Sequence, residues 1–254
     1  MPTLVIALFT AKDLLRRRIL VVLALFGVGM ILLSFPLREL TIGQWQRLIT
    51  DVGLGATELS LTLVAVFVGS SLIAGDLERR TLYPPLSKPI SRGSFVLGKF
   101  LGLSLVLLGL VGLMGGGTEF MLLAAHQQNG IAVNGAAITG IWLSVTLIGA
   151  MAILFSSFTT STLAATFTLS LTLLGHFVDN LAYFASKSGS GFGKLVSALV
   201  RVLPNFELIN LKDFAAHQQA ISGADFLHRL VYASCYCVLV VALAAIIFTR
   251  RDLK

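Results

Sequence analysis

Few residues in this sequence have the types and spacing that catalysis or ligand binding would need. The eight residues from Gly93 to Phe100 nearly match the phosphate-binding pattern G-x-x-x-x-G-K-[ST]. The last position is Phe100, so the hydroxyl that would hold magnesium is missing. An apolar run follows where the pattern requires a soluble helix. We therefore expect no nucleotide-binding site in this chain.

The other ionisable residues show no nucleophile and base at catalytic spacing. His176 and Asp179 are three residues apart and could share a helix face, but no third ligand accompanies them, so we expect no metal site. Glu119 is the one acid well inside an apolar run, and such acids are candidates for function in membrane proteins. Two interpretations of Glu119 stay open: a place on a transport pathway or gate, and a structural or interfacial position.

A charged stretch over residues 75–93 separates two strongly apolar runs. Its prolines exclude one long helix, because each lacks an N–H donor and biases the preceding residue away from helix. We predict a short turn over Glu78–Tyr83, a break, and a second helix start capped by Ser91. An apolar stripe lies beside basic residues and could insert into a groove on a soluble partner. A solvated loop made basic by topology alone explains the composition equally well.

The composition indicates that these segments belong to a membrane protein. The chain has 254 residues, of which 56% are hydrophobic and 12% charged, and soluble domains are typically ~25% charged. Apolar runs of helical spanning length recur along it. We predict an all-α membrane protein with a single transmembrane domain over residues 1–254. Its six expected spans are approximately 19–37, 59–75, 96–125, 136–155, 162–183 and 230–248.

The distribution of basic residues predicts the topology. Most of the 19 Lys and Arg residues fall in segments that six spans place on one side, namely 1–18, 76–99 and 250–254. The positive-inside rule makes that side cytoplasmic, together with both termini. The net charge of +7 then reflects topology, and we expect no nucleic-acid partner.

Two segments outside the spans also have predicted structure. Residues 3–18 carry apolar residues at helical spacing, which favours a helix lying in the cytoplasmic interface; these residues are Leu4, Leu8, Ala11 and Leu15. Residues 184–228 are too few for a hydrophobic core of their own. There we expect a Ser/Gly loop over Ser186–Gly193, followed by short helices at the extracytoplasmic interface.

The charged stretch also carries a family resemblance. The segment Gly75–Gly102 resembles the hallmark of the ABC type-2 transporter permease family, which links spans two and three. The resemblance rests on an acidic and basic run, then Thr81-Leu82, then Leu-Ser-Lys-Pro-Ile-Ser-Arg ending at Arg92, then Leu-Gly-Lys ending at Lys99. The N-terminal helix resembles the elbow of that family, and Leu203–Asp213 resembles its segment between spans five and six. The Pro84-Pro85 pair departs from the pattern and bears on where the coupling helix begins.

The resemblance implies the membrane subunit of an ATP-driven exporter in the bacterial inner membrane. Two such subunits, identical or paralogous, would pair, and two copies of a soluble ABC ATPase would bind below them. ATP and magnesium would be bound by the ATPase, and this chain would have no cofactor and no catalytic residues. The coupling segment would consist of Glu78, Arg79, Arg80, Thr81, Leu82, Tyr83, Leu86, Ser87, Lys88, Pro89, Ile90, Ser91 and Arg92. Its inserted apolar groups would be Leu82, Leu86 and Ile90, and its ionic anchors Arg79, Arg80 and Arg92.

Two other functions stay open from the sequence. A permease-like scaffold could couple ATP hydrolysis to a mechanical task on an extracytoplasmic partner, with residues 184–228 as the contact. An intramembrane enzyme would instead require polar catalytic groups within the spans, for which Glu119 and His176 are the candidates.

Overall fold

The structure is a computed structural model, and it describes residues 2–33, 45–78, 91–124, 130–187 and 191–250. Every regular element in these residues is a helix, as the sequence predicts. The helices are α1 (Pro2–Leu15), α2 (Arg18–Leu33), α3 (Trp45–Ser71), α4 (Ala74–Glu78), α6 (Arg92–Ala124), α7 (Ile131–Ser156), α8 (Ser161–His176), α9 (Val178–Lys187), α10 (Gly191–Val202), α11 (Phe206–Ile209), α12 (Lys212–Ala216) and α13 (Gly223–Arg250).

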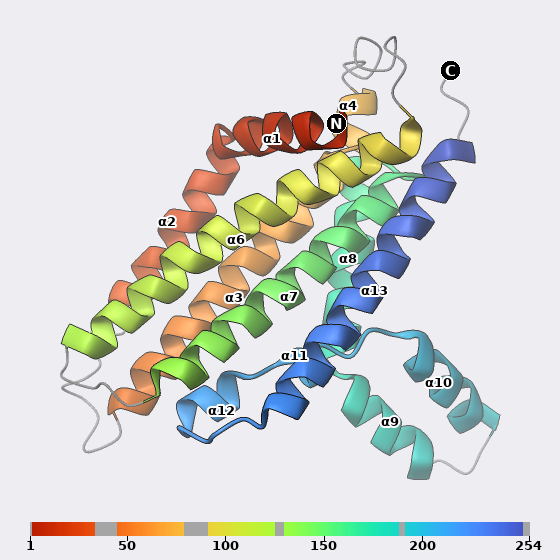
Figure 1. Ribbon diagram of the computed structural model, residues 1–254. Helices are drawn as coiled ribbons and strands as arrows, with labels where there is room; N and C mark the ends of the chain where they lie inside the picture. Colours follow the sequence, from red (N-terminus) through yellow and green to blue (C-terminus); the bar gives the residue numbers. More distant parts are fainter. Residues whose placement is uncertain (1, 34–44, 79–90, 125–129, 188–190, 251–254) are drawn as a thin grey trace.

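The long helices form one bundle with α7 at its centre (Figure 1). Helix α7 packs against α3, α6, α8 and α13. Helix α1 lies across one end of the bundle, steeply inclined to α2, and α4 and the end of α13 lie at the same end. Helices α9 to α12 lie at the opposite end. The start of α1 and the end of α13 therefore share one end of the bundle, as the predicted topology requires.

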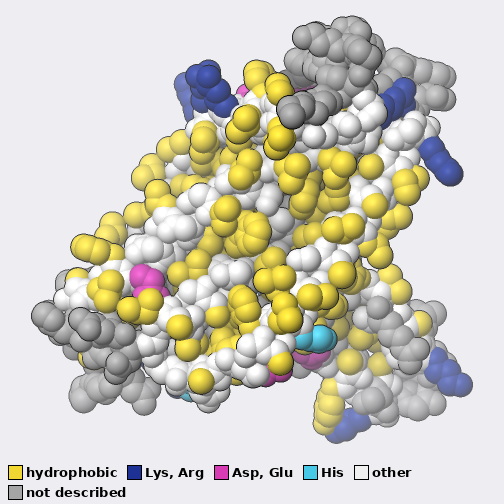
Figure 2. All heavy atoms as spheres, in the orientation of Figure 1, with side chains coloured by type: hydrophobic (Ala, Val, Ile, Leu, Met, Phe, Trp, Pro, Cys, Tyr) yellow, Lys and Arg dark blue, Asp and Glu magenta, His cyan; other side chains and the backbone are white. Residues whose placement is uncertain are grey.

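Four helical segments in the described residues are long and apolar enough to cross a membrane: Trp45–Glu78, Arg92–Ala124, Ile131–Ser156 and Gly223–Arg250. They correspond to predicted spans two, three, four and six. Predicted span one corresponds to α2, a shorter apolar helix, and residues 34–37 of that span lie outside the described residues. On the face shown in Figure 2, Lys and Arg side chains gather toward the two ends, and hydrophobic side chains cover much of the surface between them.

Helix α3 begins earlier than predicted span two. The sequence suggests a polar linker over residues 38–58, but α3 is helical from Trp45 onward. Ile49 and Ala56 are seven residues apart, so they lie on one helix face; both are buried and hold this part of α3 in the bundle. A Cβ on Gly53 would lie 2.5 Å from Thr118 of α6, so this glycine permits close approach of the two helices.

Predicted span five is not one continuous helix. The sequence suggests a span over residues 162–183, but α8 ends at His176 and α9 begins at Val178. Gly175 lies just before the break, and a Cβ there would lie 2.5 Å from the ring of Phe206 in α11. This close approach needs glycine, which also weakens the end of the helix. Beyond the break, α9 and α10 form an arm that leaves the bundle (Figure 1).

Short helices occupy most of the stretch predicted for residues 184–228, but α13 already begins at Gly223 within it. The extracytoplasmic position of these helices stays a prediction. The predicted Ser186–Gly193 loop is shorter than expected, because α9 continues through Lys187 and α10 begins at Gly191. Asn205 caps α11, since its side chain accepts a hydrogen bond from the backbone N–H of Leu208. The hydroxyl of Tyr232 accepts a 3.0 Å bond from the N–H of Asn205 and ties α11 to α13.

The predicted N-terminal helix is present as α1, and it packs against α6. A Cβ on Gly102 would lie 2.6 Å from the backbone oxygen of Ala7, so α6 needs glycine where α1 crosses it. Ala7 and Leu14 of α1 are buried. Most of the apolar stripe expected in the membrane interface is exposed on the other side of α1, with Leu4, Leu8 and Leu15 each more than half accessible. Helix α1 thus has one face on the protein and an apolar face free to contact lipid.

Candidate functional site

The predicted coupling segment is joined to the bundle through two flanks that the structure describes. Residues 79–90 lie outside the described residues, and with them most of the predicted coupling positions. Glu78, at the end of α4, and Ser91 and Arg92, at the start of α6, are described. The polar contacts of these two flanks define the candidate site.

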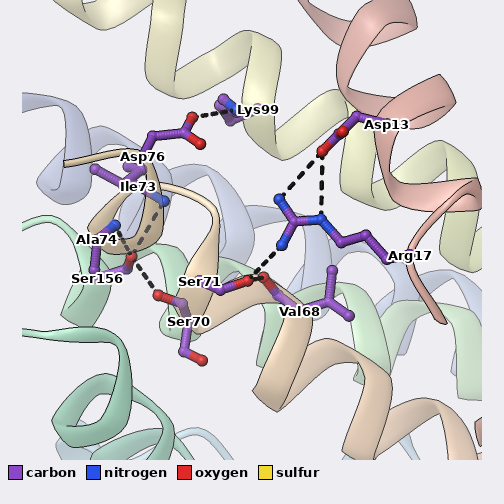
Figure 3. A network of polar contacts seen from close by, with 10 residues as sticks. All are labelled: Asp13, Arg17, Val68, Ser70, Ser71, Ile73, Ala74, Asp76, Lys99 and Ser156. Carbon is purple, nitrogen blue, oxygen red and sulfur yellow. Dashed lines mark hydrogen bonds and ion pairs between the residues drawn. The ribbon is translucent and has the colours of Figure 1, made fainter. Parts of the chain in front are cut away.

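The break between α3 and α4 is stabilised by a serine from another helix. Ser156, at the end of α7 and fully buried, accepts hydrogen bonds from the backbone N–H groups of Ala74 at 2.8 Å and Ile73 at 3.3 Å. Its hydroxyl donates to the backbone oxygen of Ser70 at 2.6 Å (Figure 3). A helix break leaves such backbone groups without helical partners. Ser156 satisfies them and fixes the angle at which α4 leaves α3.

An ion pair joins the two flanks. Nζ of Lys99 on α6 lies 2.7 Å from a carboxylate oxygen of Asp76 on α4 (Figure 3). The two side chains are only 12% and 22% exposed, so water screens the pair less than it would on an open surface. The ammonium group of Lys99 also lies 5.5 Å from the ring centre of Phe95.

Each flank makes a further contact with the bundle. The carboxylate of Glu78 accepts hydrogen bonds from the N–H and the hydroxyl of Ser161, at 3.1 and 3.2 Å, in the first turn of α8. On the other flank, Ser91 caps α6 by accepting from the N–H of Ser94, which confirms the predicted capped start. Arg92 donates to the backbone oxygen of Thr249 at the end of α13.

Arg17 connects the corner between α1 and α2 to the same region. Its guanidinium pairs with Asp13 at 3.2 Å and donates to the hydroxyl of Ser71 at 2.8 Å (Figure 3). We give the name inner polar network to residues of α1, α3, α4, α6, α7 and the corner between α1 and α2: Asp13, Arg17, Ser70, Ser71, Asp76, Lys99 and Ser156. The network connects this corner, the helix break and both flanks of the predicted coupling segment.

A second group of charges lies at the opposite end of the bundle. Glu58 of α3 pairs with Lys212 at the start of α12 and lies 3.8 Å from Nε2 of His176 at the end of α8. The side chain of Glu58 is only 12% exposed. The ring of His176 stacks on Phe206 of α11, with centres 5.1 Å apart. We call Glu58, His176 and Lys212 the outer cluster, because the predicted topology places this end of the bundle outside. The cluster joins α12 and the end of α8 to α3.

The structure separates the other sequence candidates. His176 and Asp179 do not share a helix, because the break at Phe177 lies between them; Asp179 instead accepts a hydrogen bond from Asn205 at 2.8 Å. Glu119 is partly buried in the C-terminal half of α6. The buried side chain of Asn134 on α7 lies near it.

Sequence reasoning missed Glu58 and the pairing of Asp76 with Lys99. The expected polar linker over residues 38–58 includes Glu58. However, no proline interrupts residues 45–71, and apolar residues there recur at helical spacing. Those two features predict an earlier start for span two, with Glu58 inside it. The partners Lys99 and Lys212 are distant in sequence, and nothing in the residue pattern indicates them.

Taken together, the helices and their surface define a multi-pass α-helical membrane protein. The model of the ABC-2 family of transporter proteins matches residues 10–253, so the chain belongs to that family. Membership implies a membrane-spanning permease subunit that works with an ABC ATPase, which agrees with the resemblance of the charged stretch. A comparison with curated proteins found no match.

Proposed function

We propose that this chain is the permease of an ABC exporter and that a separate ATPase subunit drives it through the segment Glu78–Arg92. Six spans, a second permease subunit and two ATPase copies complete the assembly. The bacterial inner membrane is its location, and ATP and magnesium are bound by the ATPase. The stripe of Leu82, Leu86 and Ile90 enters a groove on the ATPase, and nearby arginines pair with acidic groups there.

The observation that carries this proposal is the anchoring of both flanks of that segment. Asp76 and Lys99 hold the flanks to each other, and Ser156 holds the α3–α4 break to α7. Glu78 contacts α8 and Arg92 contacts α13. A displacement of the segment would therefore be passed to five helices of the bundle at once. A loosely attached loop would absorb the same displacement within itself.

In the proposed mechanism, the outer cluster is the element that changes between two arrangements. When Glu58, His176 and Lys212 are paired, α11 and α12 cover the outer end of α3 and α8. ATP-driven closure of the ATPase pair shifts the bundle toward a state in which these contacts separate and the outer end opens. Glu119 lies in the outer half of α6 and takes part in the exit pathway.

The experiment that tests this proposal compares the ATPase alone with the ATPase and permease together in lipid nanodiscs. We expect the permease to bind the ATPase and to change its rate of ATP hydrolysis. Arg92→Glu should weaken ATPase binding while membrane insertion remains intact, because an ionic anchor is reversed in sign. Unchanged binding by a correctly inserted Arg92→Glu variant would argue against the anchoring role of this residue.

A second function is favoured by the arm of α9 and α10, which leaves the bundle at the outer end (Figure 1). Such an arm could hold an extracytoplasmic partner, and ATP hydrolysis would then drive a mechanical task on that partner. Deletion of residues 184–202 separates the two functions. A partner that the full-length chain captures and the deletion variant loses, with no transport by either protein, favours the scaffold. Transport by the full-length chain without a captured partner favours the exporter.

A further inference from the structure

A groove of about 670 Å³ lies between α2, α3 and α8, apart from the coupling segment. Its volume falls within the usual range of ligand sites in proteins. At the end near α1 it is lined by polar residues: Arg17, Arg18, Ser71, Ser161 and Thr162. The rest of the wall is mainly apolar, with Val66, Phe67, Ala165, Leu169 and Leu173 among its residues, and it also includes the hydroxyl side chains of Ser70, Thr166 and Ser170. The groove is therefore amphipathic along its length.

The direction of the groove follows from the three helices that form it. Helices α2 and α8 begin, and α3 ends, at the cytoplasmic end of the bundle, so their terminal polar residues meet there. Ala165, Leu169 and Leu173 follow at four-residue spacing on one face of α8. From Ser161 to Leu173 the helix rises about 18 Å. One leaflet of hydrocarbon is about 15 Å thick, half of the bilayer core. The apolar wall thus spans the depth of one leaflet.

At the polar end, the carboxylate of Glu78 is bonded to Ser161, and Arg18 has no ion-pair partner among the described residues. Arg17 is paired with Asp13 and bonded to Ser71. Arg18 is exposed and forms no hydrogen bond or ion pair with other described residues. Its guanidinium can donate two parallel hydrogen bonds to phosphate oxygens. Cytoplasmic leaflets contain anionic lipids, which basic groups near the surface attract.

We propose that this groove binds one anionic phospholipid from the cytoplasmic leaflet. Its phosphate lies on Arg18, with the hydroxyls of Ser71 and Thr162 nearby, and one acyl chain follows α8 against Val66 and Phe67. A phosphate ion alone would leave the apolar wall uncovered, and a zwitterionic lipid would leave the charge of Arg18 uncompensated. Because Arg17 and Ser71 line the groove and belong to the inner polar network, the lipid would brace the base of the coupling segment. The proposal itself does not require an ATPase.

Native mass spectrometry of the purified full-length chain tests the site. The protein is equilibrated with phosphatidylglycerol or with phosphatidylcholine of the same acyl chains, and the lipid retained on the protein is measured. We expect wild type to retain phosphatidylglycerol in preference to phosphatidylcholine. Arg18→Gln should reduce that preference roughly fivefold, the factor one basic residue contributes at an anionic surface. Ala165→Phe should reduce retention of the lipid by filling the apolar part of the groove.

Arg16→Gln is the matched control, because Arg16 is exposed on the same turn but does not line the groove. It should retain phosphatidylglycerol like wild type. Glycerol 3-phosphate, which has the charged group without acyl chains, should not displace the lipid. Equal losses in Arg16→Gln and Arg18→Gln would mean a general charge effect and would overturn the site, as would equal retention of the two lipids. Thermal unfolding of each variant identifies any variant that is misfolded. Arg18→Gln removes no hydrogen bond or ion pair within the described residues, so this variant should fold and its lipid retention decides the test.

Discussion

Lys99 of α6 and Asp76 of α4 form a 2.7 Å ion pair that joins the two flanks of the segment between them. The pair lies next to the helix break that Ser156 stabilises (Figure 3). The two ends of the coupling segment are therefore fixed to each other as well as to the bundle. This arrangement limits how far the segment can move without moving α3 and α6.

The ion pair between Asp76 and Lys99 should stabilise the protein more than an exposed ion pair does, because both side chains are largely buried. Asp76→Asn or Lys99→Met should each destabilise the protein by roughly 1–3 kcal/mol, because a largely buried charged hydrogen bond is lost. The double variant Asp76→Lys with Lys99→Asp restores an ion pair and should recover part of that loss. Thermal unfolding in detergent measures the loss in the single variants and the recovery in the double variant. Asp51→Asn breaks the exposed pair with Arg47 and is the control, expected to change little. Equal effects of Asp51→Asn and Asp76→Asn would contradict the assigned role.

Ser156 should be needed to hold the break between α3 and α4. Ser156→Ala leaves the buried N–H of Ala74 and the oxygen of Ser70 without this partner, a loss of roughly 1–3 kcal/mol. Hydrogen exchange at residues 72–78 should also become faster, because the break opens more often. Thr139→Ala is a suitable control, since its hydroxyl bonds only within α7. Unchanged exchange at residues 72–78 in Ser156→Ala would show that the serine does not hold the break.

Helix α1 should detach when α6 loses the glycine at its crossing point. Gly102→Ala puts a methyl group 2.6 Å from the backbone oxygen of Ala7, which cannot yield easily. We expect a destabilisation of roughly 1–3 kcal/mol from overpacking. Gly109→Ala on the same helix has nothing within 4 Å, so it should be neutral or stabilise by up to about 1 kcal/mol. The protease sensitivity of α1 and the melting temperature of the protein are measured for both variants. A Gly102→Ala variant as stable as Gly109→Ala would show that α1 and α6 are not in close contact at Gly102.

The outer cluster should behave as one energetic unit. Glu58→Gln leaves Lys212 without its carboxylate, and Lys212→Met leaves the largely buried carboxylate of Glu58 with His176 alone. The double variant removes both charges and should be more stable than the sum of the single losses predicts, with a coupling of roughly 1–3 kcal/mol. The free energy of unfolding is measured for wild type, the two single variants and the double variant. If the losses of the two single variants add up to the loss of the double variant, the pair of Glu58 and Lys212 does not hold α12.

The sequence predicts those features of the fold that depend on residues close together in the chain. Apolar length and the positive charges locate the long spans, and proline and serine chemistry correctly places the capped start at Ser91. The early start of α3 and the break after His176 were not predicted, because packing against other helices decides both. Gly175 does not reveal in sequence that Phe206 will lie against it.

The charged stretch and the family resemblance indicate where the coupling segment lies, and that assignment stays a prediction. The contacts that hold the two flanks of this segment could not be predicted from the sequence. These contacts come from residues far apart in the chain: Ser156 reaches Ala74 and Lys99 reaches Asp76. Such pairs depend on how helices meet in space, and neither charge pattern nor spacing indicates them.

The most direct test of the account is whether the coupling segment binds an ABC-type ATPase. The tagged chain is purified in mild detergent, and co-purifying proteins are quantified by mass spectrometry for wild type, the double variant Leu82→Asp with Leu86→Asp, and the control Val202→Asp. Val202 is exposed on α10, on the arm at the opposite end. The account predicts that an ATPase with a nucleotide-binding loop co-purifies in about equal amount with wild type and with Val202→Asp, and is lost from the double variant. An ATPase retained by the double variant, or absent from wild type in several detergents, would contradict it.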